Sequence, residues 1–355
     1  MKKQGIWILA VANLVTLGCG GRITTGISRL AYRPNGDLVA FSASIDIYDA
    51  DLRKQASIPN PAGSHDYRQF DLSADGTVAI VVDYGATANV FRVPGGEPIA
   101  SFMRPGLGSV EMGTALSPHG ELVFANETQV SPATDQGPAQ VNVFGVRAAD
   151  GTPLWTLPGR LNSPGFSPDG AVVFGLNQDF ATAGSPNFLD SRLEVFDAAT
   201  GALRFAVNAG GRLSNVALGP GGQTLVGVLD TCVSRGCWEY LAAWSLTEGS
   251  LLSKVAVPEG VGLSGGAPMM SCASTEAVCA SHFYDGAVEG ISVWQPDGTF
   301  LRSITRKAPW RVWPVVSPDG RFVAVTGDDA SVYRVDDGSS VGPLRSRDGI
   351  ARSAP

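Results

Sequence analysis

The hydrophobic residues of this sequence fall in short runs, and several of these runs directly follow a tight polar turn. The clearest copy is the turn Ser167-Pro168-Asp169-Gly170, which leads at once into the apolar run 171–174. In such a turn proline presets φ, aspartate accepts a hydrogen bond from a backbone N–H just ahead, and glycine takes the positive φ that ends the turn. The pattern therefore predicts the corner of a β-hairpin.

The same corner recurs along the chain. Six copies carry a glycine at the end of the turn: Gly36, Gly76, Gly120, Gly170, Gly222 and Gly320. Successive glycines are 40, 44, 50, 52 and 98 residues apart. Half of the last interval predicts a degenerate copy near residue 271, and the segment 272–280 has Thr275 in the place of the glycine. The chain thus holds seven repeats.

A second marker recurs with the same period, namely an alternating run that ends in an aromatic residue before a polar turn. These aromatic residues are Tyr48, Phe91, Phe144, Phe196, Trp244, Trp294 and Tyr333. A short strand after the polar turn gives four strands per repeat, and such repeats of about 40 to 50 residues are typical of propeller blades. A blade buries its two faces only against neighbouring blades. We therefore predict an all-β fold, a seven-bladed β-propeller with four antiparallel strands per blade, over residues 28–347.

The Ser-Pro-Asp-Gly turns and the aromatic third strands resemble those of the WD40-like and TolB-like class of bacterial β-propellers. The resemblance runs from residue 28 to about residue 347. It implies the propeller architecture alone, because the histidine-containing and Trp-Asp dipeptides of true WD40 repeats are absent from the sequence.

Composition and charge exclude some alternatives. The 44 glycines and 23 prolines, with no long apolar stripe of period 3.6, argue against an α-rich fold. Charged residues make up 17% of the chain and the formal net charge is −7, which argues against broad electrostatic binding of nucleic acid. We expect a monomer with no nucleic-acid partner.

The N-terminus is typical of an export signal. Lys2 and Lys3 precede an apolar run at 6–17 that is too short to span a bilayer as a helix. The segment 16–19, which ends in Gly18-Cys19, resembles a bacterial lipobox. The resemblance implies that residues 1–19 are a lipoprotein signal peptide and that Cys19 is lipidated. The alternative is an ordinary secretory signal with a coincidental cysteine.

The resemblance also bears on location. Gly20, in place of an aspartate after the cysteine, favours passage to the outer membrane in enterobacterial lipoproteins. We expect residues 20–27 to form a short tether and residues 348–355 a flexible tail. The expected location is the bacterial cell envelope, outside the cytoplasm, with a lipid anchor in the outer membrane.

The other four cysteines predict disulfides, because an even number in an exported chain favours bridges over reactive thiols. Cys232 and Cys237 lie in the predicted loop between the second and third strands of blade 5. Cys272 and Cys279 flank the degenerate turn of blade 6, where a bridge would replace the rigidity of the Pro-Asp-Gly corner. Of the three possible pairings we favour these two. A four-cysteine zinc site is the competing interpretation, but it lacks the usual Cys-x2-Cys pairs.

Candidate catalytic residues are few. The histidines His65, His119 and His282 lack the His-x-His and His-Glu-x-x-His spacings of metal sites. The Gly-x-Ser-x-Gly matches at 262–266 and 338–342 lead into predicted strands rather than helices, so neither is a nucleophile elbow. His119 replaces a turn aspartate, and His282 is expected in a hairpin loop. We expect no metal, no cofactor and no catalytic set, since the residues entering the innermost strands hold one carboxylate, too few for Ca²⁺. These residues are Arg29, Gln69, Glu111, Asn162, Asn215 and Trp313.

The ring does offer a binding face. Loops that lead into the innermost strands converge near the axis, so side chains distant in sequence form one surface. In the segment 308–313 two tryptophans flank an arginine, and these residue types dominate binding hot spots. The competing interpretation is that one tryptophan plugs the channel or packs between blades. The candidate binding residues are Arg29, His65, Tyr67, Arg68, Glu111, Asn215, Trp310, Arg311 and Trp313.

Three functions are compatible with these observations. The first, which the thin catalytic inventory and the aromatic loop favour, is a membrane-anchored extracytoplasmic binding or scaffold module for a protein, peptide or glycan partner. The second is a channel-centred, metal-dependent hydrolase or lyase of the lactonase-like type, in which acidic and amide side chains around the channel hold the metal. The third is a purely structural surface protein.

Overall fold

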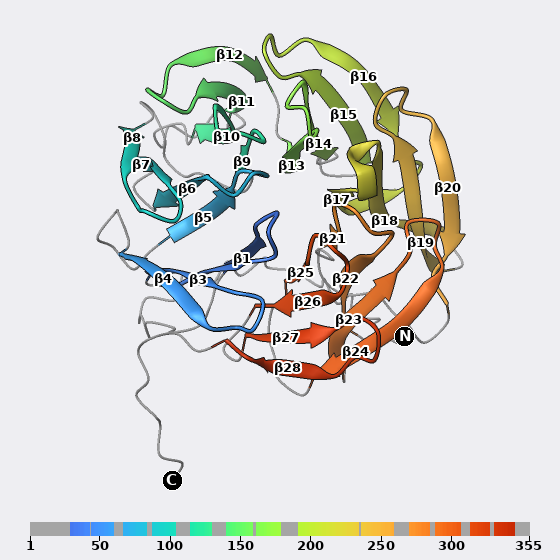
Figure 1. The fold of residues 1–355 in the computed structure, drawn as a ribbon. Coiled ribbons are helices and arrows are strands. Elements are labelled where there is room, and N and C mark those ends of the chain that lie inside the picture. Colours follow the sequence, from blue (N-terminus) through green and yellow to red (C-terminus); the bar gives the residue numbers. More distant parts are fainter. Residues whose placement is uncertain are drawn as a thin grey trace, which may run out of the picture.

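The computed structural model describes residues 29–42, 44–59, 67–83, 87–103, 114–129, 140–158, 161–178, 191–233, 236–258, 270–284, 288–306, 313–326 and 330–344. In this part of the chain, 28 strands form seven four-stranded antiparallel sheets. The sheets stand side by side around a common axis and close into a ring (Figure 1). The predicted seven-bladed β-propeller is confirmed.

Each sheet consists of four consecutive strands, the first nearest the axis and the fourth at the outer rim (Figure 1). Blade 1 contains β1 (Arg29–Tyr32), β2 (Leu38–Phe41), β3 (Ser44–Tyr48) and β4 (Lys54–Pro59). Blade 2 contains β5 (Tyr67–Leu72), β6 (Val78–Asp83), β7 (Thr87–Arg92) and β8 (Pro98–Met103). Blade 3 contains β9 (Thr114–Leu116), β10 (Leu122–Gln129), β11 (Gln140–Arg147) and β12 (Pro153–Pro158).

The second half of the ring continues in the same order. Blade 4 contains β13 (Asn162–Phe166), β14 (Val172–Gln178), β15 (Ser191–Asp197) and β16 (Leu203–Asn208). Blade 5 contains β17 (Arg212–Leu218), β18 (Thr224–Val233), β19 (Gly236–Ser245) and β20 (Leu251–Ala256). Blade 6 contains β21 (Met270–Cys272), β22 (Cys279–Tyr284), β23 (Glu289–Trp294) and β24 (Phe300–Arg306). Blade 7 contains β25 (Pro314–Val316), β26 (Phe322–Val325), β27 (Ser331–Arg334) and β28 (Ser340–Pro343).

The only helix among the described residues is a single 3₁₀ turn, η1 (Pro220–Gly222), between β17 and β18. In the described part of the chain, then, no helix has the length and apolar character needed to cross a membrane.

The repeated turn between the first and second strands is built as its sequence predicts. In blade 4, the Ser167 hydroxyl donates to Asp169 Oδ1 at 2.5 Å, and the backbone N–H of Ala171 donates to the same oxygen at 3.0 Å. The Ser167 Oγ also accepts from the backbone N–H of Val172 at 3.1 Å. Gly170 ends the turn with φ 70°. The side chains therefore satisfy backbone N–H groups that a hairpin corner would otherwise leave unpaired.

The turn glycines also leave room for the neighbouring blade. Gly120 has φ 72°, and a Cβ added there would overlap the side chain of Val78 in blade 2. Gly36 has φ 88°, but nothing lies within 4 Å of a Cβ added there. Backbone conformation alone requires glycine at Gly36, whereas conformation and close packing both require it at Gly120.

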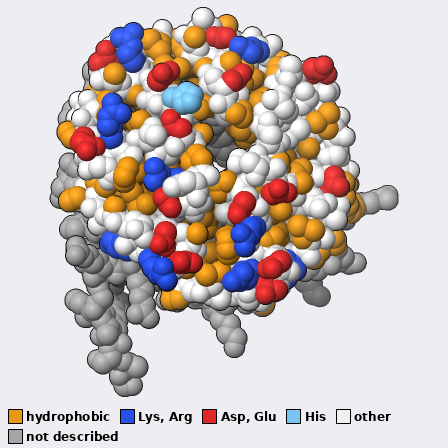
Figure 2. Space-filling model, in the orientation of Figure 1, with side chains coloured by type: hydrophobic (Ala, Val, Ile, Leu, Met, Phe, Trp, Pro, Cys, Tyr) orange, Lys and Arg blue, Asp and Glu red, His pale blue; other side chains and the backbone are white. Residues whose placement is uncertain are grey.

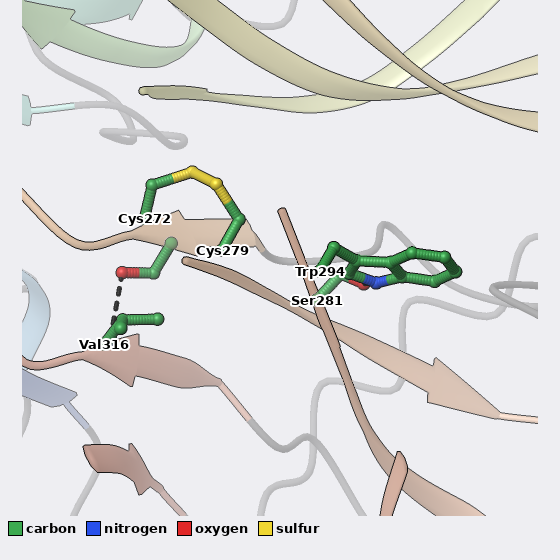
Figure 3. The surroundings of a disulfide bond; sticks show 6 residues. Cys272, Cys279, Ser281, Trp294 and Val316 are labelled. Atoms are coloured by element: carbon green, nitrogen blue, oxygen red, sulfur yellow. Dashed lines mark hydrogen bonds between the residues drawn. A yellow bond between two sulfur atoms is a disulfide. The ribbon is translucent and has the colours of Figure 1, made fainter. Parts of the chain in front are cut away.

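Blade 6 closes its first turn with a disulfide instead. Cys272 ends β21, Cys279 begins β22, and the two residues are cross-strand partners joined by a disulfide bond (Figure 3). The predicted pairing of these two cysteines is confirmed. The two cysteines are seven positions apart, as are Leu72 and Ala79, the paired residues that flank the corresponding turn of blade 2.

The assignment of Thr275 to the glycine position of this turn is wrong. Its backbone N–H donates to the carbonyl of Pro318 in blade 7 at 3.1 Å, as that of Asp75 donates to the carbonyl of Pro118 in the next blade at 3.0 Å. Thr275 therefore occupies the aspartate position. The paired residues that flank this turn are seven positions apart, as in blade 2, so Glu276 occupies the glycine position and the assignment from the halved glycine interval placed that position one residue too early.

The other pair of cysteines lies in strands, not in a loop. β18 and β19 are longer than the neighbouring strands, and Cys232 and Cys237 are direct partners in their register. Only residues 234–235 connect the two strands. The predicted loop position is wrong, because the hairpin continues past the cysteines. The bond between them stays a prediction.

Apolar side chains fill the interfaces between blades. Seven clusters each join two adjacent blades. Trp294 of blade 6 packs against blade 5, and its indole N–H donates to Ser281 Oγ at 3.0 Å (Figure 3). Leu30 of blade 1 and Val332 of blade 7 belong to the cluster that closes the ring. In the described residues no strand is shared between blades, so the ring closes by side-chain packing.

The two faces of the ring differ in the length of their connections. Because strands alternate in direction, the turns after first and third strands lie on one face, which we call the turn face. The connections after second and fourth strands lie on the other, the loop face. Thirteen of the fourteen turn-face connections have five residues and one has six, whereas loop-face connections range from two residues (234–235) to thirteen (257–269).

Candidate binding site at the ring axis

The structure describes some of the predicted binding residues and not others. Arg29 is the first residue of β1, Asn215 lies in β17, and Trp313 directly precedes β25. All three therefore lie toward the loop-face end of an innermost strand. Tyr67 and Arg68 begin β5, and only their backbone is described. Four predicted binding residues and the predicted lipidation residue fall outside the described residues: His65, Glu111, Trp310, Arg311 and Cys19.

Arg29 and Trp313 come together across the interface that closes the ring. Each precedes the turn of its own blade by four residues, so the two occupy equivalent positions in blades 1 and 7. The Arg29 Cζ lies over the Trp313 ring, 2.8 Å from its centroid. Thr326 holds Trp313 in place, because its Oγ1 accepts from the Trp313 backbone N–H at 2.9 Å. The pair is a cation–π contact between a guanidinium and an indole, the best aromatic partner for a cation.

Asp71 of β5 is a third member of this site, and the sequence interpretation missed it. The backbone N–H of Leu116 in blade 3 donates to Asp71 Oδ2 at 2.6 Å. Burial raises the pKa of Asp71 to about 6, although the N–H groups of Leu116 and Leu72 and the charge of Arg29 act in the opposite direction. Burial likewise lowers the pKa of the Arg29 guanidinium to about 9, against the attraction of Asp71. The Arg29 and Asp71 side chains thus interact electrostatically inside the ring.

A comparison of the seven innermost strands shows why Asp71 is unusual. It precedes its turn by two residues, and the equivalent residues of the other blades are small or uncharged: Ala31, Ala115, Gly165, Ala217, Ser271 and Val315. Ser271 Oγ accepts the backbone N–H of Val316 in the next blade at 3.2 Å, as Asp71 Oδ2 accepts that of Leu116. A hydroxyl is enough for this contact between blades. The carboxylate therefore adds a charge that the contact does not require.

Aligning the repeats within the sequence would have revealed Asp71. It is the only carboxylate in the described innermost strands. Its neighbours Phe70 and Leu72 are apolar, so the sequence pattern indicates an ionisable residue within a buried strand. The sequence interpretation overlooked it by considering only the residues at the entrance of each strand.

Three innermost strands are irregular near the loop face. The register shifts between Tyr67 and Gln69 in β5, between Asn162 and Gly165 in β13, and between Leu213 and Val216 in β17. Such bulges re-aim side chains and often lie beside binding sites. Asn215 lies within the third bulge and is only 7% exposed, so it is buried in the wall rather than presented at the surface.

Other buried ionisable residues are paired within their own sheets. Glu289 of β23 lies 2.8 Å from His282 Nε2, and His282 itself lies in β22 rather than in the expected hairpin loop. Asp46 of β3 lies 2.6 Å from Lys54 Nζ and accepts from Ser57 Oγ at 2.7 Å. Each of these carboxylates has its ionisable partner in its own blade, and neither belongs to the Arg29 site.

The surface charge of the ring is mixed in sign. Figure 2 shows acidic and basic side chains intermingled over one face, with a hollow near the ring axis. In the part of the chain that the structure describes, no three histidine, cysteine or acidic side chains gather as a metal site would require. The site at the axis is therefore described by Arg29, Trp313 and Asp71.

The fold is similar to that of several solved structures. One is a chain of Kuenenia stuttgartiensis hydrazine synthase, with 13% sequence identity and a TM-score of 0.63, covering 89% of this chain and 98% of that one. Another is a chain of a mitotic checkpoint complex, with 13% identity and a TM-score of 0.62, covering 95% of this chain and 100% of that one. No family model and no curated protein matches the sequence. At this identity the likeness shows the propeller fold alone.

Proposed function

We propose that this protein is a membrane-anchored extracytoplasmic module that binds a protein or peptide partner through its loop face. The observation that carries the proposal is the contrast between the two faces. Nearly all turn-face connections have five residues, whereas loop-face connections vary from two to thirteen. A scaffold that keeps one face uniform and varies the other has its recognition surface on the varied face.

Contacts between neighbouring turns support this assignment. On the turn face, the backbone N–H of Gly221 donates to the carbonyl of Ser274 at 2.9 Å, and Arg33 Nε donates to the carbonyl of Gly76 at 3.2 Å. These polar groups join adjacent blades and are already used. On the loop face, Arg29 and Trp313 supply residue types that dominate binding hot spots.

Export and anchoring rest on the sequence. Residues 1–19 have the features of a lipoprotein signal peptide that ends at Cys19, as argued above. The Cys272–Cys279 disulfide supports a location outside the cytoplasm, since such bonds persist in oxidising compartments. The lipid anchor would then hold the ring close to a membrane.

The comparisons add modest support for a binding role. One similar propeller is a chain of a multi-protein complex, the mitotic checkpoint complex. The metal-dependent hydrolase is not favoured, because a channel-centred metal needs several converging carboxylates or amides. The described innermost strands offer Asp71 as their only carboxylate.

A capture experiment from solubilised envelope membranes tests the proposal. The immobilised protein is compared with a loop-face variant, Trp310→Ala with Arg311→Ala, and with a turn-face variant, Glu121→Ala with Glu248→Ala. Glu121 and Glu248 are exposed residues of five-residue turns, so they form a matched control. We expect the loop-face variant to lose a specific partner that wild type and the turn-face variant retain. Equal capture by all three, or selective loss in the turn-face variant, would overturn the proposal.

A further inference from the structure

The Arg29 guanidinium carries a charge that its surroundings only partly compensate. Within the described residues it makes no hydrogen bond or ion pair, and its contact is the face of Trp313. Asp71 attracts it, but one Asp71 oxygen already accepts the backbone N–H of Leu116. A partly buried cation is costly unless it is paired and hydrogen-bonded. Its N–H donors are therefore available to a ligand.

The geometry selects a ligand by shape. A guanidinium is planar and presents a rigid fork of donors that matches a carboxylate or a phosphate through two parallel hydrogen bonds. The Arg29 Cζ lies over the indole of Trp313, so a ligand would engage the N–H groups that the ring does not cover. Arg29 and Trp313 both remain partly exposed, so a ligand can reach the fork.

The charge of the site selects between these two anions. A phosphate carries up to two negative charges, whereas the described site has one cation, Arg29, whose charge Asp71 partly offsets through electrostatic attraction. The formal net charge of the chain, −7, adds further repulsion for a dianion. A single carboxylate matches the single guanidinium, so the site suits an acidic residue of a polypeptide.

We propose that Arg29, held against the indole of Trp313, binds a carboxylate of an acidic peptide segment at the loop-face mouth of the ring. This inference rests on the proposed function and names the chemistry that the binding face recognises. Trp313 is a positioning residue, because its ring holds the guanidinium through a cation–π contact. Asp71 opposes a second negative charge and thereby limits the site to a monoanion.

A pair of short peptides tests this inference. The acidic probe is acetyl-Ala-Glu-Ala-amide and the neutral probe is acetyl-Ala-Gln-Ala-amide, both capped so that the glutamate side chain is the only carboxylate. Binding is followed by the indole N–H resonance of Trp313 in ¹⁵N-labelled protein, assigned with Trp313→Phe. We expect saturable shifts with the acidic probe at concentrations about tenfold or more below those needed with the neutral probe.

Two arginine variants make the test specific. Arg29→Gln should abolish the preference for the acidic probe, and Arg29→Lys should keep part of it, since an ammonium retains the charge but loses the fork. Arg53→Gln changes an exposed turn-face arginine and should leave the preference intact. Equal response to both probes, no response to either, or full preference in Arg29→Gln would overturn the inference and leave Arg29 as a structural link between blades. Loop-face capture that persists alongside such a result would show that the proposed function stands without it.

Discussion

The backbone N–H of Leu116 in blade 3 donates to the Asp71 carboxylate of blade 2 at 2.6 Å, so a buried ionisable group joins two blades beside the axis. Burial raises the pKa of Asp71 from its ordinary value of 3.8 to about 6. The folded protein therefore holds a proton between about pH 4 and pH 6 that the unfolded chain has already lost. Stability from this group is complete below about pH 4 and is lost as the pH rises through 6.

Asp71→Asn should remove this pH dependence. The wild-type free energy of unfolding, relative to that of the variant, should fall by up to about 3 kcal/mol between pH 4 and pH 7. Urea unfolding of both proteins at several pH values measures this difference. The pKa of Asp75 shifts in the opposite direction to that of Asp71. Burial acts to raise it, but hydrogen bonds led by Ser73 lower it to about 2. Parallel pH profiles for wild type and Asp71→Asn would contradict the assignment.

The Cys272–Cys279 bridge should stabilise blade 6 by restricting its unfolded chain. The cysteines are separated by seven positions in the sequence, and closing so short a loop contributes about 2 to 3 kcal/mol. The variant Cys272→Ser with Cys279→Ser should therefore unfold at lower denaturant concentration. Cys232→Ser with Cys237→Ser is the matched control, and intact-mass measurement after thiol labelling shows whether that second pair is also bonded. An unchanged midpoint for the blade 6 variant would show that the bridge is incidental.

The propeller could be predicted from the sequence because its repeats depend on local chemistry. A hairpin corner needs a positive φ, and Gly36, Gly76 and Gly320 each provide one at the expected position. The aromatic residues mark third strands because each blade must bury a large side chain against its neighbour, as Trp294 does. Each of these two signals is formed by residues that are close together in the sequence, so a single sequence shows it directly.

The axial site could be predicted only in part because its contacts join distant residues. Arg29 and Trp313 were candidates by residue type, but their stacking depends on ring closure between the first and last blades. Asp71 acts through a backbone N–H of the next blade, which no local pattern reveals. Thr275 was misplaced because its turn contains no glycine to mark the register, which only the hydrogen bond to Pro318 of the next blade reveals.

Two turn glycines separate backbone strain from packing between blades. Gly36→Ala forces a Cβ onto a residue with φ 88° but meets no neighbour, so we expect a loss of about 1 kcal/mol. Gly120→Ala has a similar φ of 72° and also overlaps Val78, so its loss should be clearly larger, about 2 to 4 kcal/mol. Thermal and urea unfolding of both variants measure the two values. Equal losses would mean that the blade 2–blade 3 contact relaxes freely around the added methyl group.

Membrane attachment through Cys19 is testable without any knowledge of the partner. If the signal peptide is cleaved directly before Cys19 and Cys19 is lipidated, wild type should sediment with membranes and resist a wash with high salt, which disrupts electrostatic attachment. Cys19→Ser lacks the acyl acceptor and should move to the soluble extracytoplasmic fraction or remain as unprocessed precursor. Cys232→Ser with Cys237→Ser, which removes two thiols elsewhere, should stay with the membranes. Salt-resistant retention of a processed Cys19→Ser protein would show that another part of the chain holds it there, and a soluble wild type would favour an ordinary secretory signal.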